Sequence, residues 1–84
     1  MNEKVINKVH LFRSSKEITQ QELADAVNVT RQTVIAIEKG NYTPSVLLAL
    51  KIAHYFNKRI EEIFSYGKDY ALYFELSTSL KYIF

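Results

Sequence analysis

The chain has 84 residues, of which 48% are hydrophobic, and a formal net charge of +2 at pH 7. This length suits a single domain with a small core, and the apolar content excludes a disordered chain. The absence of cysteine excludes disulfides and thiolate metal sites. A net charge of +2 does not by itself indicate a nucleic-acid partner, so the position of the charged side chains is the more informative observation.

The chain also lacks the segments that would direct it to a membrane. No segment approaches the roughly 18 apolar residues of a membrane-spanning helix, and the first ten residues lack the apolar core of a signal peptide. We therefore expect a cytoplasmic protein. His10 and His54 are isolated, and neither a nucleophile motif nor a glycine-rich phosphate loop is present. We expect no metal, no cofactor and no enzymatic activity.

The first part of the chain predicts a helix that ends near residues 14–16. Asn2 can cap this helix, in which Val5, Val9 and Phe12 share one face.

A second and a third helix follow with clear start and stop signals. Thr19 and Glu22 have the spacing of a capping box. Thr30 is typical of a cap for the third helix, and Gly40 is typical of its end. The side chains expected on the inner faces are Leu23, Ala24 and Val27 in the second helix and Val34 and Ile37 in the third.

Two more helices are predicted before residue 65. Residues 45–56 form the fourth, and Thr43 followed by Pro44 suits its start because proline is tolerated at the first helical position. Residues 60–64 form the fifth. The expected inner-face residues are Val46, Ala49, Leu50, Ala53 and Phe56 in the fourth helix and Ile60, Ile63 and Phe64 in the fifth.

Residues 65–84 differ in composition and hold more than half of the aromatic residues. Alternation places Tyr70, Leu72 and Phe74 on one face, which is typical of a strand. A helix would also bring several aromatic side chains to one side, but the β-branched and aromatic content favours strands. The predicted fold is therefore an all-α, five-helix domain over residues 1–64 with a C-terminal, β-forming extension over residues 65–84.

The second and third helices are separated by only three residues, 27–29, and neither is long enough to be stable alone. Ala24 is small enough to lie where two helices cross, and Asn28 tolerates a left-handed turn. Apolar residues at the right offsets would lock the crossing. Such a unit holds its second helix away from the body, where it can enter a DNA major groove about 12 Å wide.

Residues 5–64 resemble the lambda-repressor/Cro-like family of helix-turn-helix regulators. The resemblance is carried by the segments ITQQELADAVNVTRQTVIAIEKG, YTPSVLLALKIAHYF and IEEIF. It implies a five-helix domain that binds double-stranded DNA as a homodimer on a nearly palindromic operator. Glu17 and Asn28 depart from the family, which often has glycine at both positions.

The outer side of the third helix is the candidate base-reading surface. Arginine can form a bidentate hydrogen-bond pair with guanine, glutamine can do so with adenine, and isoleucine suits a thymine methyl group. The predicted base-reading residues are Arg31, Gln32, Thr33, Ile35 and Ala36. The predicted phosphate-contacting residues are Gln20, Thr30, Lys39, Asn41, Tyr42 and Thr43. Ordinary surface or packing roles are the alternative for these residues. The resemblance also pairs Arg13 with Glu38, which would hold the third helix at its angle.

The aromatic C-terminal extension is the candidate dimer interface. A free hairpin edge is a liability that pairing with another chain removes. The predicted dimerisation residues are Ile63, Phe64, Tyr66, Tyr70, Leu72 and Phe74. The alternative is that the extension packs on its own helices.

The function that this pattern favours is sequence-specific DNA binding by a homodimeric transcriptional regulator, with repression as the expected outcome. A restriction–modification controller and an antitoxin that regulates its own operon use the same chemistry and stay open. A protein-interaction module of the same fold is the alternative from another class, and the polar face of Arg31, Gln32 and Thr33 speaks against it. No small-molecule effector is expected.

Overall fold

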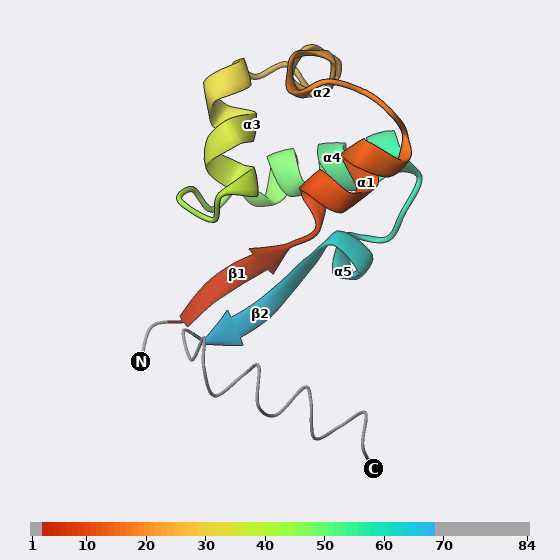
Figure 1. Ribbon diagram of the computed structural model, residues 1–84. Coiled ribbons are helices and arrows are strands. Elements are labelled where there is room, and N and C mark those ends of the chain that lie inside the picture. Colours follow the sequence, from red (N-terminus) through yellow and green to blue (C-terminus); the bar gives the residue numbers. More distant parts are fainter. Residues whose placement is uncertain (1–2, 69–84) are drawn as a thin grey trace, which may run out of the picture.

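The computed structural model describes residues 3–68, which form five helices and a two-stranded antiparallel sheet (Figure 1). The helices are α1 (Val9–Ser15), α2 (Gln20–Val27), α3 (Arg31–Glu38), α4 (Val46–Phe56) and α5 (Ile60–Ile63). The strands are β1 (Glu3–Asn7) and β2 (Phe64–Lys68). The predicted five-helix fold is confirmed. Among the described residues the longest helix has 11 residues, which is too short to cross a bilayer.

The prediction for the N-terminal segment is wrong. Residues that were expected in the first helix form β1, in which Val5 lies opposite Tyr66 and Asn7 lies opposite Phe64. Helix α1 begins only at Val9. The cause is that β1 pairs with a strand at the other end of the described chain, and no local pattern reveals such a distant partner.

The core receives at least one buried side chain from every helix and from β2. Leu23 and Ala24 of α2 have no exposed surface, as predicted, so the small side chain of Ala24 lets α2 and α3 pack closely. The core residues are Val9, Leu23, Ala24, Val27, Val34, Ile37, Leu48, Ala49, Ile52, Ala53, Phe56, Ile63 and Phe64. Neither the helix pair α2 and α3 nor the sheet of β1 and β2 could bury this much apolar surface alone.

Helix α4 buries Ala49, Ala53 and Phe56, as predicted, but its buried face is shifted away from two other predicted residues. Val46 and Leu50 are 73% and 49% exposed, whereas Leu48 and Ile52 are 7% and 1% exposed. Because α4 is apolar on nearly all sides, its periodicity does not select the buried face. The helix begins after Ser45, whose side chain accepts a hydrogen bond from the N–H of Leu48 at 3.1 Å.

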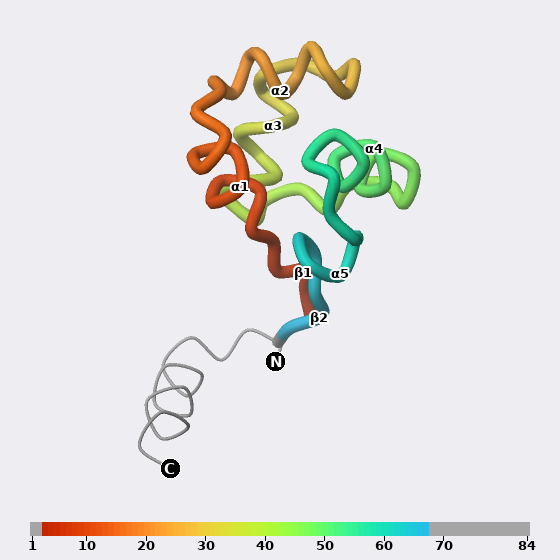
Figure 2. Tube along the Cα trace, turned by 90° about the vertical axis from the view of Figure 1, so that its right-hand side faces the viewer, coloured from red at the N-terminus to blue at the C-terminus, as the bar shows by residue number. Residues whose placement is uncertain are grey.

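The sheet and α2 lie at opposite ends of the molecule (Figure 1, Figure 2). The N–H of Lys8, between β1 and α1, donates to the carbonyl of Ile63 at 2.8 Å and joins the start of α1 to the end of α5. Strand β2 spans residue 64, the expected boundary between the domain and its extension. The division into residues 1–64 and 65–84 stays a prediction, and the strand expected from Tyr70 onward lies outside the described residues.

Candidate nucleic-acid interface

The turn between α2 and α3 depends on Asn28. Its φ of 62° and ψ of 50° are left-handed, as predicted, and asparagine tolerates this region better than most residues. The N–H of Val29 donates to the carbonyl of Ala24 at 2.9 Å and closes α2. Thr30 then caps α3 by accepting a hydrogen bond from the N–H of Thr33 at 3.2 Å. The turn therefore sets where α3 begins.

Helix α3 divides its side chains between the core and the solvent. Val34 and Ile37 are each 1% exposed and hold the helix against the body. Arg31 and Gln32 are exposed at its N-terminal end. Within residues 3–68 no hydrogen bond ties either of these two side chains to the protein. Both are therefore positioned to bind a partner.

The other predicted base-reading residues lie nearer the body. Thr33, Ile35 and Ala36 are half-buried, so each offers only part of its surface to a ligand. The hydroxyl oxygens of Thr33 and Thr30 lie 3.1 Å apart, which ties Thr33 to the start of its own helix.

The loop after α3 carries most of the predicted phosphate contacts. Gly40 has a φ of 79°, which glycine adopts without the cost that a side chain would add. The N–H of Asn41 donates to the carbonyl of Ala36 at 2.9 Å and fixes the start of the loop. The exposed residues of this segment are Lys39, Asn41, Tyr42 and Thr43.

Glu38, the last residue of α3, joins three helices. Its carboxylate accepts a hydrogen bond from Arg13 Nε at 2.7 Å and another from Gln20 Nε2 at 3.1 Å. Arg13 Nη1 also donates to the carbonyl of Ile18 at 2.9 Å. The structure has the expected Arg13–Glu38 pair, whereas the contact of Glu38 with Gln20 was not predicted. One amide hydrogen of Gln20 is thereby used inside the protein, and its second amide hydrogen and backbone N–H remain for a ligand.

The Glu38 carboxylate stays charged although its side chain is only 7% exposed. Burial by itself raises the pKa of this group, but hydrogen bonds from Arg13 and Gln20 and the charges of Arg13 and His10 outweigh burial. The net effect lowers the pKa of Glu38. The hydrogen bond with Glu38 in turn raises the pKa of Arg13. The pair is therefore fully ionised at neutral pH.

A polar recess of about 550 Å³ opens between the first turn of α2 and the start of α3. The residues that line it are Arg13, Thr19, Gln20, Gln21 and Arg31. Anions favour the N-terminus of a helix, where backbone N–H groups point outward, and a guanidinium beside it adds further donors. Thr19 and Gln21 were not predicted as site residues, although the capping box of Thr19 and Glu22 indicates where α2 begins.

The predicted dimerisation residues differ widely in how much of their surface is exposed. Ile63 is 1% exposed and offers no surface to a partner, which corrects one predicted contact. Phe64 is 9% exposed and lines a groove at the sheet, while Tyr66 is 66% exposed. The remaining predicted residues, Tyr70, Leu72 and Phe74, lie outside the described residues.

The family model for helix-turn-helix proteins matches residues 10–63, which extend from α1 to α5. The chain belongs to the helix-turn-helix family. The matched segment includes α3 and the left-handed turn that precedes it.

Three similar proteins illustrate the range of this family. A protein of Methanocaldococcus jannaschii, named as an uncharacterized helix-turn-helix-type transcriptional regulator, is 51% identical over 75% of this chain and 96% of its own length. The CTXphi transcriptional repressor RstR of Vibrio cholerae is 29% identical over 70% of this chain and 53% of its own length. The crystal structure of the restriction–modification controller C.AhdI from Aeromonas hydrophila superposes with a TM-score of 0.61 at 26% identity, covering 64% of this chain and 82% of that one.

Proposed function

We propose that this helix-turn-helix protein is a sequence-specific DNA-binding repressor of transcription that acts as a homodimer on a palindromic operator. One observation carries the proposal. Arg31 and Gln32 are exposed at the N-terminal end of α3, while Val34 and Ile37 behind them are buried. A helix held in this way presents its first turn to base edges in a major groove.

Base recognition would come chiefly from Arg31 and Gln32. Their side chains offer paired donors, or a donor and an acceptor, which match the major-groove edges of guanine and adenine respectively. Thr33, Ile35 and Ala36 would contribute smaller contacts because they are half-buried. Each good bidentate pair discriminates against the wrong base by about 1–3 kcal/mol.

Phosphate contacts would hold the domain in register on both sides of α3. The recess at the start of α2 supplies the backbone N–H groups of Gln20 and Gln21 beside Arg31. The loop after α3 supplies Lys39 and Tyr42, together with Thr30, Asn41 and Thr43. These contacts carry no sequence information, and they would make the affinity fall as salt is raised.

A homodimer explains how so small a reading surface would reach useful specificity. Two copies of α3 placed about 34–36 Å apart would meet the same face of the DNA, one helical turn apart. Repression is favoured over activation by the likeness to a phage repressor. A regulator bound over a promoter needs no further contact to exclude other proteins.

A restriction–modification controller is the second candidate function. The structural similarity to C.AhdI, with a TM-score of 0.61, supports it. Both functions require the same base-reading helix, and they differ in which genes lie beside the operator.

Selection of bound sequences from random DNA, followed by affinity measurements on the selected site, tests the proposal. We expect a palindromic site with two half-sites about 10 base pairs apart. Arg31→Ala and Gln32→Ala should each weaken binding to this site about 10- to 100-fold while leaving non-specific binding nearly unchanged.

The matched control is Lys51→Ala, which removes one positive charge from an exposed position on α4. This variant should bind the selected site with nearly the original affinity. If Arg31→Ala and Gln32→Ala retain full affinity for the selected site, the assignment of α3 as the reading helix is wrong.

A further inference from the structure

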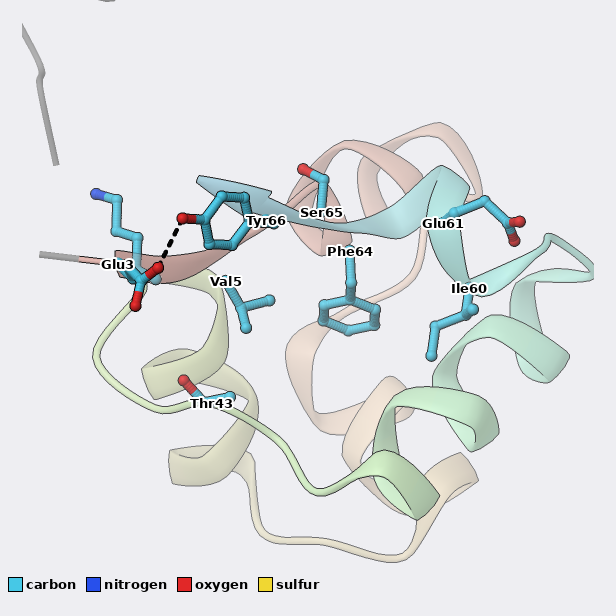
Figure 3. A pocket seen from close by; sticks show the side chains of 9 residues that line it. Glu3, Val5, Thr43, Ile60, Glu61, Phe64, Ser65 and Tyr66 are labelled. Carbon is cyan, nitrogen blue, oxygen red and sulfur yellow. Dashed lines mark hydrogen bonds between the residues drawn. The ribbon is translucent and has the colours of Figure 1, made fainter. Parts of the chain in front are cut away.

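An open apolar groove of about 590 Å³ lies at the sheet, at the end of the molecule opposite α2 (Figure 1, Figure 3). The side chains of Val5, Ile60 and Phe64 extend into it from β1, α5 and β2 (Figure 3). Thr43, in the loop before α4, lies across the groove from the sheet, and Tyr66 lies at its outer end (Figure 3). Apolar walls that face water favour an apolar occupant.

The chain itself supplies a segment of suitable chemistry beside this groove. Strand β2 ends at Lys68, paired with Glu3 at the outer end of the groove. The 16 residues that follow are rich in apolar side chains, and their alternation places Tyr70, Leu72 and Phe74 on one face. A seven-residue extended segment is about 23 Å long, enough to lie along two short strands.

The direction of β2 decides from which copy the segment would come. The strand points away from the helices (Figure 1), so a segment that continued straight would leave its own groove behind. Returning into that groove would require a tight reversal directly after Lys68. Two-residue hairpin turns need backbone conformations that glycine and asparagine supply, and residues 69–84 contain no glycine, asparagine or proline. Asp69 follows Lys68 directly, but Tyr70 after it is unsuited to the positive φ that a type I′ turn needs at both central residues, and the next turn-forming residues are Ser77, Thr78 and Ser79.

We propose that the groove binds residues 70–76 of a second copy of this chain, so that two copies exchange their C-terminal segments. The exchange would cover Val5, Ile60 and Phe64 with Tyr70, Leu72 and Phe74 of the partner copy. It would also place a segment of the partner copy at the edge of the two-stranded sheet. A sheet of only two strands has marginal stability by itself. This inference rests on the proposed homodimer and names the surface that forms it.

Disulfide trapping tests the proposal directly because the full chain contains no natural cysteine. Thr43→Cys is placed at the groove, and Leu72→Cys or Phe74→Cys is placed in the segment. Full-length chains that carry one cysteine each are mixed, oxidised and analysed by mass spectrometry. We expect a disulfide between position 43 of one chain and position 72 or 74 of the other.

The control pairs the same segment variants with Gln21→Cys, an exposed position in α2 at the far end of the molecule. This pair should yield less than about one tenth of the cross-linked product. Equal yields for positions 43 and 21 would overturn the proposal. An intramolecular disulfide in the double variant T43C/L72C, in place of the intermolecular one, would show that the segment binds its own groove and would also overturn it.

Sedimentation equilibrium gives a second, independent measurement. The double variant L72D/F74D places two charges on the face that would enter the groove, and we expect its dimer dissociation constant to rise at least 100-fold. The matched control S77D/S79D adds the same charge at polar positions and should leave the dissociation constant nearly unchanged. A dimer of unchanged strength in L72D/F74D would overturn the proposal.

The two proposals fail in different ways. If the cross-link is absent while Arg31→Ala loses affinity for the selected site, the groove assignment falls and the DNA-binding function stands. If the cross-link forms while Arg31→Ala binds normally, the exchange stands and the proposed function falls.

Discussion

The helix-turn-helix unit and the sheet of β1 and β2 each contain a side-chain hydrogen bond of the same length. Arg13 Nε donates to Glu38 at 2.7 Å across the helices, and the Tyr66 hydroxyl donates to Glu3 at 2.7 Å across the sheet. Their surroundings differ, because the Glu38 side chain is 7% exposed and Tyr66 is 66% exposed. Water competes for the second bond and is excluded from most of the first.

We infer from this difference that burial, not length, decides what such a bond contributes to stability. An exposed hydrogen bond exchanges partners with water at little net gain, whereas the loss of one partner of a buried ion pair leaves a charge without compensation. The two regions also differ in the roles that we propose for them. A helix that is to read bases needs one fixed angle, which the buried pair would supply. The sheet of β1 and β2 is stabilised by a more exposed contact and leaves an apolar groove open. This arrangement suits a surface that a second copy of the chain would cover.

The largest effect on stability is expected for a substitution of Glu38, in the buried ion pair. Glu38→Gln removes the negative charge while keeping the size, so Arg13 stays mostly buried without a counter-charge. We expect the free energy of unfolding to fall by about 3 kcal/mol. Chemical denaturation monitored by circular dichroism measures this loss.

The corresponding variant in the sheet is Tyr66→Phe, which removes only the hydroxyl group that donates to Glu3. Because this bond is exposed, we expect a loss of no more than about 0.5 kcal/mol. Comparable losses from the two variants would contradict the argument that burial decides the contribution.

The helix-turn-helix unit was the part of the fold most open to prediction. Its signals are local: Thr19 and Thr30 cap helices, Asn28 accepts a left-handed conformation, and all three do so in the structure. The buried faces of α2 and α3 also followed from spacing, because each helix has one apolar side and one polar side. The outward position of Arg31 and Gln32 is the consequence of those buried faces.

The parts that prediction missed depend on contacts far apart in the chain. β1 exists because of a partner strand at the other end of the described residues, and its local pattern equally suits a helix. In α4 nearly every position is apolar, so only packing selects Leu48 and Ile52 over Val46. The bond from Gln20 to Glu38 requires knowing how two helices cross.

Asn7 connects the two regions and gives the next largest effect. Its amide Nδ2 donates to the carbonyl of Ile37 at 2.8 Å, near the end of α3, and its Oδ1 accepts from the N–H of Val9 at 3.1 Å. Asn7→Asp keeps the acceptor, removes the donor and places a charge beside a carbonyl oxygen. We expect a loss of about 2 kcal/mol in unfolding free energy, measured by denaturation.

Asn7→Ser is the control, because serine can still accept from Val9 and brings no charge toward Ile37. It should lose less than Asn7→Asp. If Asn7→Asp is as stable as the native protein, the hydrogen bond from Asn7 to Ile37 contributes nothing to stability.

Acid should weaken the helix-turn-helix unit through Glu38. Since the folded state lowers the pKa of this carboxyl, its contribution is fully present above the ordinary value of about 4.5. The contribution is lost as the pH falls through the lower, folded-state value. We expect the unfolding free energy of the native protein to decline below about pH 4.5, and the decline to be shallower in Glu38→Gln, as measured by denaturation at stepped pH. Parallel curves for the two proteins would contradict this role of Glu38.

A small effect of the opposite sign is expected at Glu17, which joins α1 to α2 with a φ of 58°. A side chain in this left-handed region costs about 1–2 kcal/mol, and glycine avoids that cost while giving the unfolded chain more freedom. We therefore expect Glu17→Gly to stabilise the protein by about 0.5–1 kcal/mol, seen as a higher melting temperature. Lys16, with a φ of −87°, is the control, and Lys16→Gly should destabilise it by a similar amount. If glycine lowers stability at both positions, the side chain of Glu17 makes contacts whose contribution to stability exceeds the cost of its left-handed backbone. The connection from α1 to α2 is then stabilised by more than the buried ion pair.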